Sequence, residues 1–519
     1  MAWSLSDKER AGTAARIAAN ISTLAFFRGR EFSDADAQEI AAAIEKKAYT
    51  AALVAARTTT GDRPAAEITS GYIRKLAELV LEAVKQGITK ADAAPSAAGS
   101  GEEHDLFGSR DFLDAESAEK ALAPLLAARA AIKKVRFSTK SFGRDAAGVA
   151  ARALRSVAHV LEHADMSDII AGRAEDEALE ALRIMSAALA TARLKHLNLS
   201  DNALGEKGVR AAADAFVGQE GLEFLSLQNV GCSVHACKAV AELLRHTAAL
   251  TGLHLFNNMS GDEGATYIST VLARAPAMAD FRMASSRVGP AGGIALAQGL
   301  SAGRVLVRLD LSDNPMTSEV APALAAALAQ QPQLRALNLN DTSLTDEGVA
   351  TVCKGLVGAA PELQELELAL NEITPQGAVA VAAALANKKH LTKLNLRENE
   401  LESAGAAAVA RALPGLPALQ FLDLAANQFS RAGALAVARG LVSGGRQSFS
   451  RLVLDENYLT DDAVEAVRDL LVGALGGDSC LSAEELDPDA AEEEEEEEEG
   501  MQDDEGDALA AALEKGAHI

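Results

Sequence analysis

The sequence predicts an α/β solenoid, in which a short strand and a helix alternate along one axis. One observation is the motif Leu-x-x-Leu-x-Leu-x-x-Asn, which begins at Leu194 and recurs about every 28 residues. Another is the Ala- and Leu-rich, helix-forming sequence that follows each copy. Later copies begin at positions 222, 250, 278, 306, 334, 363, 391, 419 and 449, and weaker ones at Ile132 and Leu161. This period is typical of the leucine-rich repeat, so we expect about twelve units in a ribonuclease-inhibitor-like horseshoe, with a parallel sheet on the concave face and helices outside.

Each part of the repeat has a physical role. The leucines of the strand alternate with polar residues, so the leucines point inward and the residues between them face out. The closing asparagine, at what we call the ladder position, can bond backbone groups of its own turn and of the next. A glycine six residues later lies near the start of the helix, where a missing side chain allows close packing. The ladder asparagines are Asn202, Asn258, Asn314, Asn371, Asn399, Asn427 and Asn457.

Composition changes along the chain predict four parts: a small helical domain at 1–92, a linker at 93–111, the repeat array at 112–477 and a disordered acidic tail at 478–519. The first part has no repeat and reads as helices at 6–20, 33–50 and 72–86. The linker is rich in small residues, Gly and Ser. The tail has eighteen acidic residues against Lys515, and its eight consecutive glutamates must repel one another.

The charge and the cysteines limit the partner and the compartment. The net charge is −25, which disfavours nucleic acid because phosphate would be repelled, and a basic protein is the natural complement. Four cysteines are too few for a disulfide framework in a chain of this length, so we expect reduced thiols in a cytosolic or nuclear setting. With no apolar leader and no uninterrupted apolar run of about 18 residues, we expect neither secretion nor membrane insertion.

Searches for catalytic motifs find no chemistry of the chain's own. The sequence has no Gly-Lys dipeptide, so no P-loop, and no His-Glu-x-x-His. His159 and His163 are four residues apart but have no further ligand nearby, so neither a metal nor a cofactor is expected. Function is therefore expected in a binding face.

Two repeats depart from the motif. In the copy at 222 the ladder position is Val230, and an asparagine stands one place earlier, at Asn229. Either Asn229 presents its amide to a partner at the strand end, or it forms a local bond to the turn backbone. In the copy at 278 the ladder residue is Ser286, and Arg282 falls on an outward strand position, as a contact or as a solvated charge.

The outward positions also give a map of the concave face. The exposed Phe224 and Phe256 that it predicts would be unusual on a polar face and would mark a contact patch. The early repeats are expected to present His196, Asn198, Phe224, Gln228, His254 and Phe256, and the later ones Asp310, Glu365, Glu367 and Asp423 among Lys393, Arg397 and Arg451.

The array resembles the Ran GTPase-activating proteins. Residues 194–208, 256–266 and 167–173 carry the resemblance, and the acidic tail is of the kind that this family carries. The first 90 residues are similar to the WPP domain of the plant-type members. That similarity rests on Trp3, Arg10, Arg16 and residues 42–48, although Trp3-Ser4-Leu5 stands where the domain has Trp-Pro-Pro.

The resemblance implies an activator of the GTP form of Ran in nucleocytoplasmic transport, and not an enzyme with chemistry of its own. In this family no arginine finger is supplied, and the activator orders the GTPase's own glutamine, which positions the attacking water. Asn229 matches the asparagine implicated in this step, and Arg173 matches an arginine important for the interaction. Further expected partner contacts are Asn202, Asn257, Asn258 and Arg282.

The resemblance also implies a location. The chain is expected in the cytoplasm at the outer face of the nuclear envelope, held by anchor proteins that bind the N-terminal domain. The alternative function is a leucine-rich-repeat scaffold or inhibitor of the ribonuclease-inhibitor type, which binds a basic protein stoichiometrically.

Overall fold

The computed structural model describes residues 102–127, 132–444, 449–475 and 480–483, together with a few residues of the first hundred. Those few are residues 10, 17, 41, 44–46, 48, 49, 72, 75 and 76. The chain divides into two compact units, Met1–Ser100 and Gly101–Ile519. Each unit is described by itself.

The described residues of the first unit are helical and meet at one buried carboxylate. Arg10 donates through Nε and Nη2 to the two oxygens of Glu45, at 2.9 and 2.7 Å, and the hydroxyl of Tyr72 donates to the same side chain at 3.1 Å. The guanidinium of Arg10 also lies 4.0 Å from the ring centroid of Tyr49. These contacts join residues from all three predicted helices. Trp3 and Arg16 lie outside the described residues.

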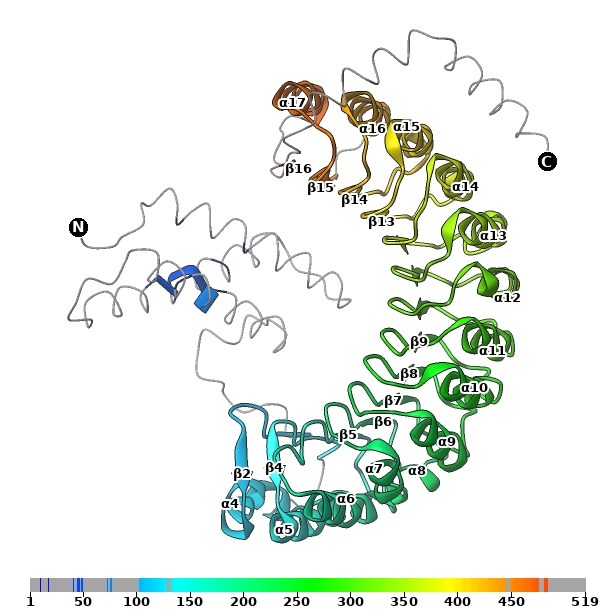
Figure 1. Cartoon of the computed structure of the whole chain (residues 1–519). Helices are drawn as coiled ribbons and strands as arrows, with labels where there is room; N and C mark the ends of the chain where they lie inside the picture. The colour runs from blue at the N-terminus through cyan, green and yellow to red at the C-terminus, as the bar shows by residue number, and fades with distance from the viewer. Residues whose placement is uncertain are drawn as a thin grey trace. The chain divides into compact units, whose positions relative to one another are not determined.

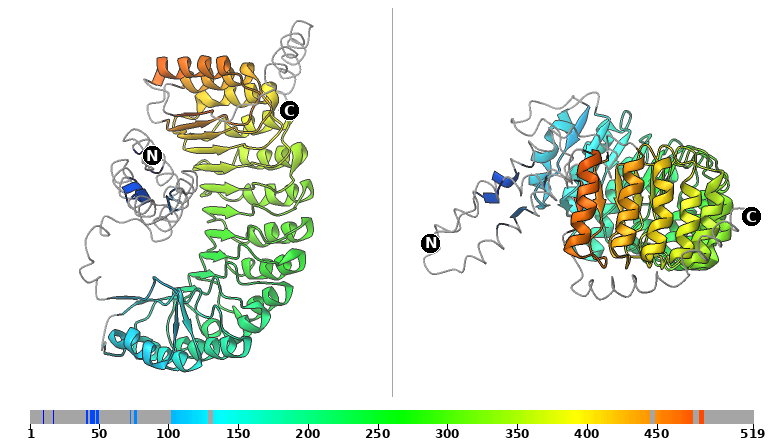
Figure 2. Two further views of the ribbon diagram at one scale, coloured as in Figure 1. Left: turned by 60° about the vertical axis from the view of Figure 1, so that its left-hand side comes forward. Right: turned by 90° about the horizontal axis from the view of Figure 1, so that it is seen from above.

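The second unit is a repeat array built on one parallel sheet (Figure 1). Each strand pairs in register with the next one along the axis, and helices cover the outer side of the curve (Figure 2). In order the strands are β1 (Glu103–Asp105), β3 (Lys134–Arg136), β5 (His163–Asp165), β6 (His196–Asn198), β7 (Phe224–Ser226), β8 (Gly252–His254), β9 (Asp280–Arg282), β10 (Arg308–Asp310), β11 (Ala336–Asn338), β12 (Glu365–Glu367), β13 (Lys393–Asn395), β14 (Phe421–Asp423), β15 (Arg451–Val453) and β16 (Leu481–Ser482). The predicted α/β leucine-rich-repeat solenoid is confirmed.

The outer layer holds at least one helix for each repeat. These are α4 (Ala115–Ala127), α5 (Arg144–Val157), α6 (Glu175–Leu189), α7 (Gly205–Ala211), α8 (Asp214–Val217), α9 (Val234–Leu243), α10 (Gly261–Leu272), α11 (Pro290–Leu300), α12 (Ala321–Leu328), α13 (Thr345–Val357), α14 (Pro375–Leu385), α15 (Glu402–Ala412), α16 (Arg431–Ser443) and α17 (Asp461–Leu475), with short 3-10 helices η2 (Ser318–Val320) and η3 (Leu413–Gly415). A separate small sheet pairs β2 (Asp111–Leu113) with β4 (Lys140–Phe142).

The array extends further at both ends than the sequence predicts. Twelve of the strands, β3 and β5 to β15, lie within 112–477 as expected. Strand β1 lies inside the segment expected as a linker, where Leu106 N donates to the carbonyl of Arg136 at 2.8 Å. Strand β16 lies beyond residue 477, and its Ser482 carbonyl accepts from Leu454 N at 2.8 Å. Both strands form by backbone pairing to a ready edge and need no leucine motif, so the motif could not reveal them.

The ladder asparagines bond backbone groups of their own turn, as predicted, but their bonds to another repeat go to the preceding repeat and not to the next one. All seven are buried, and each donates through Nδ2 to backbone carbonyls of its own turn and of the preceding repeat. Asn258, for example, donates to the carbonyl of Leu227 at 2.9 Å, and its Oδ1 accepts from Val230 N and Cys232 N at 3.2 and 2.8 Å. Asparagine stands at alternate ladder positions from 202 to 342, where Val230, Ser286 and Thr342 intervene, and at every one from 371 to 457.

The helix glycines allow the close stacking that the sequence predicts. A Cβ at Gly377 would lie 2.1 Å from Oδ1 of Asp346 in the neighbouring helix, and one at Gly433 would lie 3.1 Å from the Cα of Ser403. Larger residues would force these helices apart. Among the residues that the structure describes, no helix is both long and apolar enough to cross a bilayer.

Candidate interaction surface

The edge of the array where the strands end forms a regular rim. We call the residue just before each ladder position the rim residue. From repeat to repeat, the rim residues are Asp168, Asp201, Asn229, Asn257, Ser285, Asp313, Asp341, Leu370, Glu398, Ala426 and Glu456, and all have φ between 48° and 60°. Asn and Asp tolerate this left-handed conformation better than most residues.

The rim backbone is fixed by hydrogen bonds between repeats. Asn229 N donates to the carbonyl of Phe256, and Asn257 N to that of Ala284, both at 3.0 Å. Because the backbone groups are used, it is the side chains that remain for binding, and Asn229 and Asn257 are exposed. The rim is thus a row of side chains on a rigid support.

Around Asn229 the rim side chains form a hydrogen-bonded chain. Asn257 Nδ2 donates to Asn229 Oδ1 at 3.2 Å, and Asn229 Nδ2 donates to Asp201 Oδ1 at 3.0 Å. A side-chain amide has two N–H groups and an oxygen that accepts two bonds, so these contacts use half of the capacity of Asn229. The carboxylate of Asp201 can only accept, which fixes the direction of both amides.

This geometry corrects the sequence-based argument for Asn229. The residue lies past the end of β7 with its amide exposed, but its position is not exceptional, because every repeat has a rim residue. The side-chain contacts of Asn229 are to the side chains of Asp201 and Asn257 and not to the turn backbone. Presentation of its amide to a partner stays a prediction. What distinguishes Asn229 is an amide held between a carboxylate and a second amide. Asp201 was not among the predicted site residues, although its place one residue before the ladder residue Asn202 is visible in the sequence.

Two expected partner contacts are wrong. Asn202 and Asn258 are only 1% and 5% exposed, and their amides are bonded to the backbone of the ladder. A partner cannot reach them. Within each segment it is the rim residue, Asp201 or Asn257, that faces solvent.

Arg173 is held inside the protein. Its Nε donates to Ser141 Oγ at 3.0 Å, and its Nη2 donates to the carbonyls of Ser141 and Leu113 at 2.8 and 3.1 Å. Glu177 lies 3.5 Å from Nη1, and the side chain is 16% exposed. Arg173 therefore fastens the small β2–β4 sheet to the loop before α6, and it offers little surface to a partner.

Arg282 is engaged on the concave face. Its Nε and Nη2 donate to the two oxygens of Asp280 at 2.9 and 3.0 Å, and Nε2 of His254 lies 3.1 Å from Oδ2. Burial alone would raise the pKa of Asp280, but the close contact with His254 and the hydrogen bonds from Arg282 outweigh it and hold this pKa below its ordinary value. Arg282 is half-buried and its guanidinium is already bonded to Asp280, so a partner would have to bind Arg282 with this ion pair in place.

The concave face carries a column of rings across β5 to β8. His163 stacks on His196 with centroids 4.3 Å apart, His196 stacks on Phe224 at 5.5 Å, and the ring of His254 meets Phe224 edge-on at 4.7 Å. Gly252 provides the room, because a Cβ there would lie 2.3 Å from Phe224. Phe224 and Phe256 are half-buried, so the prediction that both rings are exposed on this face is wrong.

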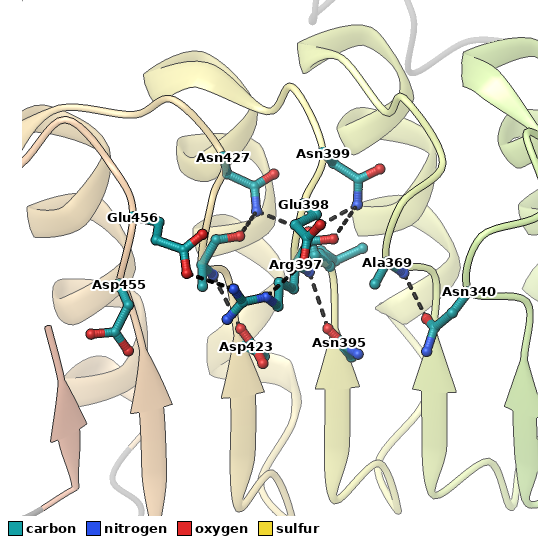
Figure 3. A network of polar contacts seen from close by, with 12 residues as sticks. Asn340, Ala369, Asn395, Arg397, Glu398, Asn399, Asp423, Asn427, Asp455 and Glu456 are labelled. Atoms are coloured by element: carbon teal, nitrogen blue, oxygen red, sulfur yellow. Dashed lines mark hydrogen bonds and ion pairs between the residues drawn. The ribbon is translucent and has the colours of Figure 1, made fainter. Parts of the chain in front are cut away.

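In the last repeats the rim is occupied by ion pairs. Arg397 donates through Nε to Glu398 at 2.9 Å and through Nη2 to Glu456 at 2.7 Å, which joins two rim residues (Figure 3). Asp423 lies at the end of β14, and burial raises its pKa above the ordinary value. Arg397 thus compensates much of the negative charge that this end would otherwise present.

Among the described residues no cluster of three or more His, Cys, Asp or Glu side chains could hold a metal ion. The four cysteines are free and buried, with Sγ of Cys232 and Cys237 3.4 Å apart. A hydrogen bond with Cys237 and burial raise the pKa of the Cys232 thiol well above its ordinary value.

Comparison with known proteins agrees with this architecture. A leucine-rich-repeat family model matches residues 194–211, 331–353, 361–382 and 387–410. The match and the parallel sheet with alternating helices agree on a leucine-rich-repeat fold.

Within that class, the resemblance to the Ran GTPase-activating proteins is confirmed. The chain is 36% identical to RAN GTPase-activating protein 1 of Arabidopsis thaliana over 231 residues, 43% of this chain and 42% of that protein. It is 44% identical to RAN GTPase-activating protein 2 of the same plant over 147 residues, 27% of each. It is also 29% identical to ribonuclease inhibitor of Sus scrofa over 199 residues, 38% of each. The chain matches less than half the length of each of these relatives.

Proposed function

We propose that this chain is a GTPase-activating protein for Ran, which binds the GTP form and accelerates hydrolysis in nucleocytoplasmic transport. The observation that carries the proposal is its similarity to two proteins named RAN GTPase-activating proteins. The exposed amides of Asn229 and Asn257 support it, because each can both donate and accept hydrogen bonds at the surface.

The proposed mechanism is positioning. Asn229 orients the catalytic glutamine of the GTPase, which in turn places the attacking water in line with the γ-phosphate. Its neighbours Asp201 and Asn257 fix the amide in advance, so little orientational freedom is lost on binding. The bonds of Arg173 and Arg282 within the array favour a mechanism in which neither acts as an arginine finger.

The test is hydrolysis of GTP by Ran with a catalytic amount of the full chain. An activator turns over many GTPase molecules, so one part in a hundred should still bring all bound GTP to GDP well ahead of the intrinsic rate. If phosphate release scales only with the molar ratio of the two proteins, or is not accelerated, the proposal fails.

A stoichiometric inhibitor of a basic protein is the second candidate, favoured by the similarity to ribonuclease inhibitor and by the net charge of −25. The same assay separates the two functions. An inhibitor would bind its partner one to one and would leave the hydrolysis rate unchanged.

For the two ends of the chain we propose roles in location and association. Residues 1–92 would bind anchor proteins at the outer face of the nuclear envelope, so removing them should abolish location there and leave activation in solution largely intact. The acidic tail from residue 478 would attract a basic partner by its charge. Its removal should lower the association rate at low salt and matter much less at high salt.

A further inference from the structure

The largest exposed apolar side chain among the described residues lies on the small β2–β4 sheet. Phe112 is 58% exposed, and it stands opposite Ser141 in the register of β2 and β4. Its ring rests on Gly172, where a Cβ would lie 2.8 Å from Cζ, and its centroid is 5.1 Å from the guanidinium carbon of Arg173. An aromatic ring that is held from below and open above has the form of an interface anchor.

A second exposed apolar side chain lies at the strand-end edge of a later repeat. Met259 is 54% exposed and directly follows Asn257 and the ladder residue Asn258. Four of the other large apolar side chains that are exposed in the described array belong to helices: Leu126 to α4, Val357 to α13, Val379 to α14 and Val472 to α17. The fifth, the rim residue Leu370, is 44% exposed and lies four repeats beyond Met259. Phe112 and Met259 share the edge on which Asn229 lies.

Polar rim residues lie between these two residues. Arg110, next to β2, forms an ion pair with the rim residue Asp168, and the chain from Asp201 to Asn257 follows. The repeats of β1 and β8 are five strand spacings apart in the sheet, which at about 4.8 Å each is roughly 24 Å. A standard interface of about 800 Å² on each partner has a similar width.

We propose that Phe112 and Met259 are apolar anchors at the two ends of the interface with the GTPase, with Asn229 between them. This inference rests on the proposed function and names the surface through which it acts. The partner must present an apolar recess at each end and hydrogen-bonding groups at the centre. Arg173 is then a positioning residue, which holds the loop beneath Phe112 and leaves the contact to the aromatic ring.

The anchors are tested by the Michaelis parameters of the full chain with Ran in its GTP form. Phe112→Ala and Met259→Ala should each raise KM about tenfold and change kcat less than twofold, because an anchor contributes equally to the ground state and the transition state. Val379→Ala on α14 is the matched control and should change neither parameter. Phe112→Leu, which keeps an apolar side chain, should recover most of the affinity.

The role of Arg173 is tested by combining substitutions. If Arg173 acts through Phe112, the rise in KM for Arg173→Ala with Phe112→Ala should be no larger than that for the worse single variant. If the two residues made independent contacts, the fold-changes in KM of the single variants would multiply in the double variant, because their free energies would add. Additive effects would reject the positioning role and make Arg173 a contact in its own right.

Each remaining outcome separates the anchors from the proposed function. If the unchanged protein stimulates hydrolysis but both alanine variants keep KM within twofold, the anchors are rejected and the function stands. If the unchanged protein does not stimulate hydrolysis, the proposed function fails first. If Phe112→Ala lowers the melting temperature, its KM cannot be interpreted, and the KM values of Phe112→Leu and Met259→Ala then test the anchors.

Discussion

The rim around Asn229 and the rim around Glu398 share one backbone conformation but differ in chemistry. Both have left-handed residues just before a ladder position. Near Asn229 the side chains are two amides and a carboxylate joined in a line, and about half of the amide's hydrogen-bonding capacity stays open to solvent. Near Glu398 the carboxylates of Glu398 and Glu456 are bound by Arg397.

The difference shows how a repeat array separates support from recognition. The ladder and the left-handed turn are common to both regions, so they account for stability and not for specificity. Recognition depends on which side chain the turn presents and on whether another side chain already satisfies it. The following substitutions test this separation.

The largest expected effect is loss of stability on Asn399→Ala. The substitution leaves buried N–H groups of Asn371 and Ile373 and three carbonyls without the amide that bonds them. We expect a cost of about 3 kcal/mol in the free energy of unfolding, measured by chemical denaturation. The folded fraction should activate normally. A loss of activation without loss of stability would show that the ladder also takes part in recognition.

Asn229→Ala should reduce activation and leave stability nearly unchanged, the reverse of Asn399→Ala. Its side chain is exposed, so the melting temperature should change little, whereas stimulated hydrolysis should fall at least tenfold, about 1.4 kcal/mol of barrier. Single-turnover hydrolysis at saturating activator gives the comparison. Glu398→Ala, at the corresponding rim position, is the control and should stay within twofold of the unchanged rate. An early melt with full activity of the folded fraction would make Asn229 structural.

Asp280→Asn should give a pH-dependent loss of stability. The folded-state pKa of Asp280 is lowered by His254 and Arg282, so its carboxylate stabilises the fold above its ordinary pKa, and that contribution disappears as pH falls below about 4. The variant should be about 1 kcal/mol less stable at pH 7, with the difference shrinking only below about pH 4. Denaturation curves across this range test it, and a difference that grows on acidification would contradict the assigned sign.

The smallest effect is expected for Arg397→Ala. Its ion pairs with Glu398 and Glu456 are partly exposed, so the cost should be about 0.5 kcal/mol and should decrease with salt. Hydrolysis should not change. If activation fell markedly, the two rims would both bind the partner and the contrast between them would disappear.

The sequence predicts the repeat, the sheet and the ladder because each depends on a local pattern of apolar residues and asparagines. It does not predict which side chains of neighbouring repeats contact one another on the rim and on the concave face. Asn202 and Asn258 were expected to bind a partner because they lie in characteristic segments, and only the register of the turn shows that their neighbours face solvent. Phe224 was expected to be exposed, but Gly252 on the next strand gives its ring a place to pack. The short edge strands β1 and β16 depend on backbone pairing, which leaves no signature in side chains.

The spacing of the ladder asparagines affects how readily single turns of the array open locally. From Asn371 to Asn457 every repeat is joined to the preceding one by a buried amide, so opening one turn breaks bonds in two repeats. Between 202 and 342 Val230, Ser286 and Thr342 interrupt this series, and fewer such bonds resist separation there. Backbone amides in this stretch should therefore exchange with solvent sooner than those beyond Asn371. The turn that carries Asn229 lies in this stretch, so the exchange rate of its backbone amides would measure how firmly the rim is supported there.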